Sequence, residues 1–129
     1  MSTQTPKALW PLFRDPTEAM EFSKRLIGGK EHADKQALLA IGLNKTNPKW
    51  TRIAAIYALG FVGTYNSAPR LRNILQDGDD DPDVRGHAAE ALANIGDKMA
   101  IDLLRDVLGH QPPAELRTSC EYALQELAA

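Results

Sequence analysis

The sequence predicts an all-α fold in which helical hairpins stack into an α-α superhelix. Three observations support this prediction. Ala and Leu are abundant while β-branched residues are sparse, so the composition favours helices over strands. The segment from Asp81 to Gly96 carries the start and stop signals of one complete helix. Two further segments align with it, at a period that is typical of stacked repeats.

The segment 81–96 has clearly marked ends. Asp81 is a good N-cap residue, and Pro82 suits the first helical position because an N–H there would have no helical partner. Gly96 is suited to the left-handed turn that ends many helices. We therefore expect a helix from Pro82 to Ile95.

The repeat is clearest at three arginines that lie 33 and 32 residues apart, Arg52, Arg85 and Arg117. An Ala-Leu pair and then an aliphatic residue follow each arginine at matching distances. Each repeat is expected to form two antiparallel helices joined by a short connection. The predicted repeats are approximately 31–63, 64–96 and 97–129, and the predicted helices are 32–43, 48–61, one from 67 or 69, 82–95, 97–109 and 112–129.

The residues ahead of the repeats are expected to close one end of the stack, because a stack leaves a hydrophobic end that must be covered. Residues 1–14 contain a short apolar cluster and are predicted to form a lid. Asp15 and Glu18 have the spacing of a capping box, which predicts a capping helix over 16–27. Residues 15–129 are thus expected to form one domain of about three hairpins plus an N-terminal capping helix.

Composition excludes several classes of protein. No apolar run approaches the roughly 18 residues of a membrane span, and the first residues lack the apolar core of a signal peptide. A single Cys allows no internal disulfide, which fits a reducing compartment. We therefore expect a cytoplasmic protein with no membrane partner.

The net charge of −2 is unevenly distributed along the chain. Residues 1–75 carry eleven Lys and Arg against five Asp and Glu, whereas residues 76–129 carry four against twelve. Such halves could align with a charged partner or stack head to tail. They could equally be two solvated faces, and the sequence favours this simpler interpretation.

The pattern Pro-x-Val-Arg-x-x-Ala-x-x-Ala-Leu-x-x-Ile-Gly, found from Pro82 to Gly96, resembles the HEAT-like repeat of the phycobilisome-lyase type. The resemblance implies a right-handed superhelix whose concave side is lined by the second helix of each hairpin. It also implies that Arg52, Arg85 and Arg117 form a structural ladder between hairpins. An arginine ladder that binds an anionic partner is the alternative.

The second helices carry one face that stays apolar in every repeat and one that varies. The varying face reads Trp50, Ala54, Tyr57, Phe61 in the first repeat, Asp83, His87, Glu90, Asn94 in the second, and Glu115, Ser119, Tyr122, Glu126 in the third. A constant framework with a variable, partly aromatic face is typical of a recognition surface. Alternatively, Trp50 and Phe61 fold back onto neighbouring loops or the lid. The predicted partner-binding residues are Trp50, Tyr57, Phe61, His87, Glu90, Asn94, Tyr122 and Glu126.

Signals for catalysis or metal binding are weak, and no catalytic, cofactor-binding or metal-binding residue is predicted. The acidic loop 77–83 lacks the Gly and Glu of a calcium-binding EF-hand, and we interpret it as a solvated turn. His87 and Glu90 have the spacing of two metal ligands but no further ligands pair with them. HEAT-like deoxyhypusine hydroxylases use adjacent His-Glu pairs; here Ala88 follows His87, so the resemblance does not support that activity. Cys120 aligns with core alanines and is expected to be a buried hydrophobe.

These observations favour a non-enzymatic protein-protein interaction module, acting as a scaffold, a regulator or a toxin-neutralising binder through its concave face. The alternative is an accessory or catalytic subunit of a bilin chromophore lyase, because the resemblance implies bilin as a ligand. A second alternative is nucleic-acid binding. It is disfavoured because the basic residues are scattered and the C-terminal half is acidic.

Overall fold

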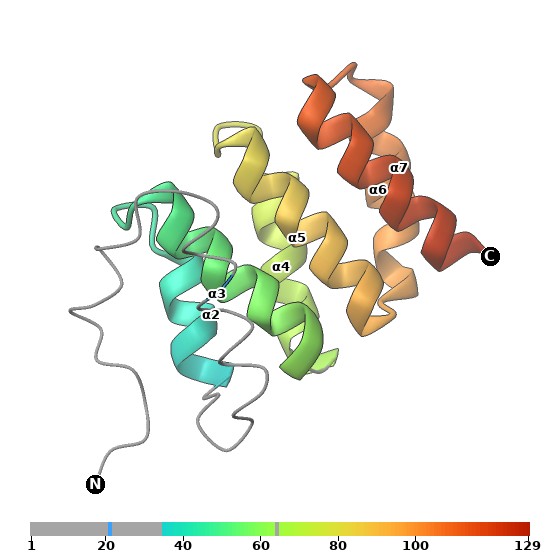
Figure 1. Cartoon of the computed structure of the whole chain (residues 1–129). Helices are drawn as coiled ribbons and strands as arrows, with labels where there is room; N and C mark the ends of the chain where they lie inside the picture. The colour runs from blue at the N-terminus through green and yellow to red at the C-terminus, as the bar shows by residue number, and fades with distance from the viewer. Residues whose placement is uncertain (1–20, 22–34, 64) are drawn as a thin grey trace, which may run out of the picture.

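The computed structural model describes residues 21, 35–63 and 65–129. The predicted lid and capping helix fall almost entirely outside these residues. The described part is all-helical, with two layers of helices (Figure 1). The helices are α2 (Lys35–Leu43), α3 (Lys49–Val62), α4 (Ala68–Gln76), α5 (Pro82–Ile95), α6 (Ile101–Gly109) and α7 (Ala114–Ala128), with 3-10 turns at Tyr65–Ser67 and Lys98–Ala100.

The helices pair as three hairpins, α2 with α3, α4 with α5 and α6 with α7, and the hairpins stack side by side. Helices α3, α5 and α7 form one layer, in which α5 packs against both neighbours. Helices α2, α4 and α6 form the other layer. This architecture confirms the predicted α-α solenoid. No helix in the described part of the chain is long and apolar enough to cross a bilayer.

Helix α5 has the predicted ends. The Asp81 side chain accepts a hydrogen bond from the backbone N–H of Asp83 (2.8 Å), as an N-cap should. Gly96 has φ 83°, and its N–H and that of Asp97 both bond to the carbonyl of Leu92. These bonds satisfy backbone groups that the helix ends leave open, so the local sequence alone defines both ends of α5.

The core lies between the two layers. It contains aliphatic residues of the first helices, such as Leu38, Leu71 and Leu104, and of the second helices, such as Leu59 and Leu92. Cys120 is also fully buried, as predicted. Burial raises the pKa of its thiol to about 11, so the neutral form is favoured and the side chain acts as a small hydrophobe.

Two details of the first hairpin differ from the predictions. Ala54, placed on the varying face, is fully buried, because its short side chain lies on a helix flanked by α2 and α5. Pro48, the predicted first residue of the second helix, instead occupies the N-cap of α3, without a side-chain hydrogen bond. Asn47 instead donates from Nδ2 to the carbonyl of Ile41 (3.1 Å) and ties the loop to the end of α2.

Candidate functional site

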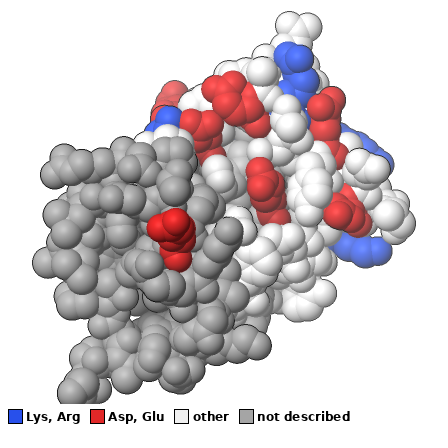
Figure 2. Space-filling view, in the orientation of Figure 1, with Lys and Arg blue, Asp and Glu red and all other residues white. Residues whose placement is uncertain are grey.

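The outer side of α3, α5 and α7, here called the second-helix face, carries the predicted binding residues. Phe61 and Tyr122 are exposed at 52% and 44%, and Asn94 and Glu126 are exposed as well. Tyr57, His87 and Glu90 are half-buried. Figure 2 shows carboxylates over the described part of this face, with Lys and Arg side chains near its edges. The face is therefore a mixed aromatic and acidic surface.

The structure brings some of the predicted residues together and leaves others apart. The rings of Tyr57 and Phe61 lie on one helix with centroids 5.2 Å apart and an interplanar angle of 55°. Asn94 lies next to Gly60 across the contact between α3 and α5. Trp50 sits at the other end of α3, half-buried against the core, with Nζ of Lys49 4.9 Å from its ring centroid. Trp50 thus packs partly against the core of the protein.

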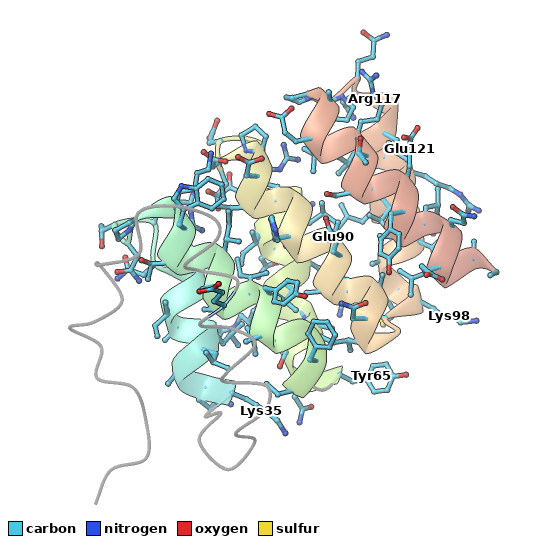
Figure 3. All side chains as sticks on the ribbon, in the orientation of Figure 1. Lys35, Tyr65, Glu90, Lys98, Arg117 and Glu121 are labelled. Atoms are coloured by element: carbon cyan, nitrogen blue, oxygen red, sulfur yellow. The ribbon has the colours of Figure 1, made fainter. Side chains whose placement is uncertain are left out.

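Glu90 and His87 each have a partner of their own. Oε2 of Glu90 accepts a hydrogen bond from Oγ of Ser119 (2.7 Å), which links α5 to α7. Nδ1 of His87 lies 2.8 Å from the carbonyl oxygen of Asp83. Among the described residues, no group of three or more His, Cys, Asp or Glu could hold a metal ion. The described residues therefore do not fit a metal centre, whereas the Ser119 bond holds the Glu90 carboxylate in a defined orientation. Glu90 projects from α5, the middle helix of the second-helix face (Figure 3).

The acidic loop 77–83 is exposed or half-buried at most positions, as a solvated turn should be, but Asp80 is buried and other carboxylates of the loop are paired. Lys45 pairs with Asp77, and Lys49 pairs with Asp83. A hydrogen bond from Lys45 lowers the pKa of Asp77, and one to Asp83 raises the pKa of Lys49. Loop carboxylates of the second repeat are thus matched by basic residues of the first, across the gap between two hairpins. Sequence reasoning missed these pairs because the partners lie about thirty residues apart in the chain.

Asp80 is the buried member of this loop, with 8% of its surface exposed. Its two carboxylate oxygens each accept a 2.8 Å hydrogen bond from Arg52, one from each terminal nitrogen. Nε of Arg52 donates to the carbonyl of Gly42 (2.9 Å). Nε of Arg85 donates in the same way to the carbonyl of Leu75 (2.9 Å). The predicted structural ladder is therefore present at Arg52, which joins the first hairpin to the second.

A family model for HEAT repeats matches residues 35–125, most of the chain. The chain belongs to the HEAT-repeat family. It is 32% identical over 118 residues to deoxyhypusine hydroxylase of Saccharomyces cerevisiae, a match that covers 90% of this chain and 35% of that protein. It is 34% identical over 106 residues to deoxyhypusine hydroxylase-B of Oryza sativa, covering 82% of this chain and 34% of the relative. No solved structure matches significantly.

This HEAT-repeat chain spans about a third of the length of these two relatives. Other deoxyhypusine hydroxylases match a shorter stretch; that of Arabidopsis thaliana is 37% identical over 73 residues, 57% of this chain and 23% of the relative. The similarity thus concerns the repeats that this chain contains and a part of each enzyme.

The relatives correct two predictions. The phycobilisome-lyase subtype is not supported, because the relatives carry the name of a different enzyme. The prediction of a non-enzymatic interaction module is wrong, because these relatives are enzymes, and the bilin and nucleic-acid alternatives fit them no better. The sequence interpretation set deoxyhypusine hydroxylases aside because Ala88 follows His87. That His-Glu pair is absent from α5, although the similarity to these enzymes extends over most of the chain.

Proposed function

We propose that this protein takes part in the hydroxylation of deoxyhypusine or a similar lysine-derived side chain, and that its second-helix face receives that side chain. The observation that carries the proposal is the 32% identity to a deoxyhypusine hydroxylase over 90% of this chain. The described residues do not fit a metal centre, so the proposal concerns substrate binding and includes no step of oxygen chemistry.

The chemistry of the side chain suits this face. Deoxyhypusine is a lysine side chain extended by an aminobutyl group, so it presents two cationic amines separated by apolar methylenes. A receiving surface needs carboxylates for the amines and apolar or aromatic surface for the methylenes. Glu90 and Glu126 provide carboxylates, and exposed Tyr122 and Phe61 provide aromatic surface. Glu90 is the strongest candidate for an amine contact, because its bond from Ser119 fixes one oxygen and a carboxylate can accept further hydrogen bonds.

The test is a titration of the full chain with N-acetyl-deoxyhypusine amide, followed by calorimetry or NMR. Deoxyhypusine should bind more tightly than N-acetyl-lysine amide, because it carries a second amine. Glu90→Gln should weaken deoxyhypusine binding about tenfold, the effect expected for losing one hydrogen bond between charged groups. Gln can still accept the Ser119 bond, so the packing of α5 against α7 is kept.

The matched control is Glu121→Gln, which makes the same chemical change at the outer edge of α7 (Figure 3). Its affinity for deoxyhypusine should equal that of the wild type. Equal binding of deoxyhypusine and lysine would contradict the proposal, as would equal losses in the two variants.

A further inference from the structure

The ladder that joins the first two hairpins is incomplete between the second and third. Asp80, the acceptor for Arg52, immediately precedes the N-cap residue of α5. The residue in the same place before α7 is Pro112, which has no side-chain acceptor. Arg85 keeps the anchoring bond from Nε to the carbonyl of Leu75, as Arg52 does to Gly42. Among the described residues, neither terminal nitrogen of Arg85 has a hydrogen-bond acceptor.

Arg85, whose terminal nitrogens have no hydrogen-bond acceptor among the described residues, borders a cavity. The cavity has a volume of about 390 Å³ and lies between the α4–α5 loop, α6 and the α6–α7 loop. Its lining includes Arg85, Gln76, Leu103, Val107, His110 and Pro112. The guanidinium of Arg85, the amides of Gln76 and Gln111 and the imidazole of His110 are the side-chain groups that can donate, while the aliphatic and proline side chains form apolar walls. Asp106 also lines the cavity, and its carboxylate lies 3.9 Å from Nδ1 of His110.

The loop that closes the cavity holds an unusual backbone conformation. Gln111, also in the lining, has φ 54°, the left-handed region that is unfavourable for residues other than glycine. Such strained residues concentrate at sites where the chain positions a ligand. The strained residue directly precedes Pro112, so the conformation of Gln111 helps to set where the two prolines stand relative to Arg85.

We propose that this cavity is a binding site for a carboxylate group, which takes the place on Arg85 that Asp80 takes on Arg52. A guanidinium binds a carboxylate through two parallel hydrogen bonds, the arrangement seen at 2.8 Å in the Arg52–Asp80 pair. Leu103 and Val107 suit a short apolar body attached to the carboxylate. This inference does not depend on the proposed function, because no residue proposed to receive the deoxyhypusine side chain lines this cavity.

The carboxylate could come from a small free acid or from an acidic side chain of another polypeptide, and two probes separate these sources. The first is glutarate, with glutaramide as its neutral counterpart. The second is the capped peptide Ala-Glu-Ala, with capped Ala-Gln-Ala as its counterpart. Binding to the full chain is followed through the Nε–H resonances of the arginines in 15N-correlated spectra. At least one carboxylate probe should cause a saturable shift of Arg85, and its neutral counterpart should not.

Three variants test the geometry. Pro112→Asp places a carboxylate where the first ladder step has one, so it should occupy Arg85 and weaken probe binding about tenfold or more. Pro112→Asn is the matched control without the charge and should retain more of the affinity. Arg85→Lys keeps the charge but loses the two-nitrogen fork, and should also weaken binding about tenfold.

The proposal is overturned if neither carboxylate probe saturates on the wild type, or if a neutral counterpart binds equally well. It is also overturned if the folded Arg85→Lys variant binds like the wild type. Melting curves show whether each variant is folded. If Pro112→Asp is unfolded, the binding measured for Arg85→Lys tests the proposal in its place. Loss of deoxyhypusine binding in the Glu90→Gln experiment has no bearing on these outcomes, so the two proposals fail separately.

Discussion

Arg52 and Asp80 form a buried ion pair whose side chains are 5% and 4% exposed. Taking two charges out of water costs free energy of desolvation. Here the bidentate hydrogen bond between the two side chains and the bonds to neighbouring backbone groups offset that cost. The Gly42 carbonyl accepts from Nε of Arg52, and the N–H of Asp81 donates to Asp80 (2.7 Å). The pair therefore determines how the first hairpin meets the second more than it adds net stability.

We predict that Asp80→Ala lowers the free energy of unfolding by about 3–5 kcal/mol, because it leaves a buried guanidinium without its counter-charge. The double variant Arg52→Met, Asp80→Leu should cost clearly less, since no charge then remains buried. Denaturant unfolding measures both values. Asp79→Ala, at an exposed position in the same loop, should be close to neutral. A double variant that is less stable than Asp80→Ala would contradict this account of the pair.

The carboxyl group of Asp80 should make the stability of the fold depend on pH. Burial alone would raise the pKa of Asp80, but the hydrogen bonds from Arg52 and Asp81 and the charge of Arg52 outweigh it, so the pKa lies below 3.8. A carboxyl whose pKa is lower in the folded state stabilises the fold above its ordinary pKa. That contribution is lost as the pH falls through the folded value.

Stability measured by urea unfolding should therefore be steady near neutral pH and fall below about pH 4. Asp80→Asn, which does not ionise, should show a shallower fall over the same range. Equal slopes for the wild type and this variant would show that other groups cause the acid sensitivity.

At the scale of the element, the second helices lie close together because small residues meet at their contacts. A Cβ added to Gly60 of α3 would lie 3.2 Å from the backbone Cα of Ala91 in α5. Gly86 of α5 is as closely covered, because an added Cβ would lie 2.9 Å from Oγ of Ser119 in α7. These contacts bring α3, α5 and α7 into one layer and let Ser119 reach Glu90.

Gly60→Ala should lower the free energy of unfolding by about 1–3 kcal/mol, less the gain from the higher helix propensity of Ala. The loss arises because the backbone of α5 must move away from the new methyl group. Gly78→Ala is the control, since no atom lies within 4 Å of an added Cβ there. It should be neutral or slightly stabilising in the same denaturation experiment, and a stabilised Gly60→Ala would show that the helices can separate at little cost.

At the scale of the whole molecule, part of the charge difference between the two halves of the chain is neutralised by ion pairs between them. Basic residues of the first repeat, such as Lys45 and Lys49, pair with loop carboxylates of the second. The boundary between the basic and acidic halves therefore lies at a contact between hairpins. Some of the charges that the sequence suggested were solvated therefore help to hold the first hairpin against the second.

The sequence by itself determined the helices and their stacking. Caps such as Asp81 and Gly96 act within a few residues, and the apolar pattern repeats with the helix period, so both can be recognised without a structure. The side of the second helices that forms the second-helix face was predictable for the same reason. Which residues are exposed on that face was not predictable, because Ala54 is covered by its neighbours and Trp50 packs against the core.

Only the tertiary structure decided which distant side chains meet. The Arg52–Asp80 pair, the Ser119–Glu90 bond and the cavity beside Arg85 each join residues from different repeats or loops. Periodicity shows that arginines recur, but it does not show which of them finds a carboxylate. That depends on the one residue before each following helix, Asp80 in one case and Pro112 in the other. The repeat thus specifies the scaffold, and departures from the repeat, brought together by folding, create the candidate sites.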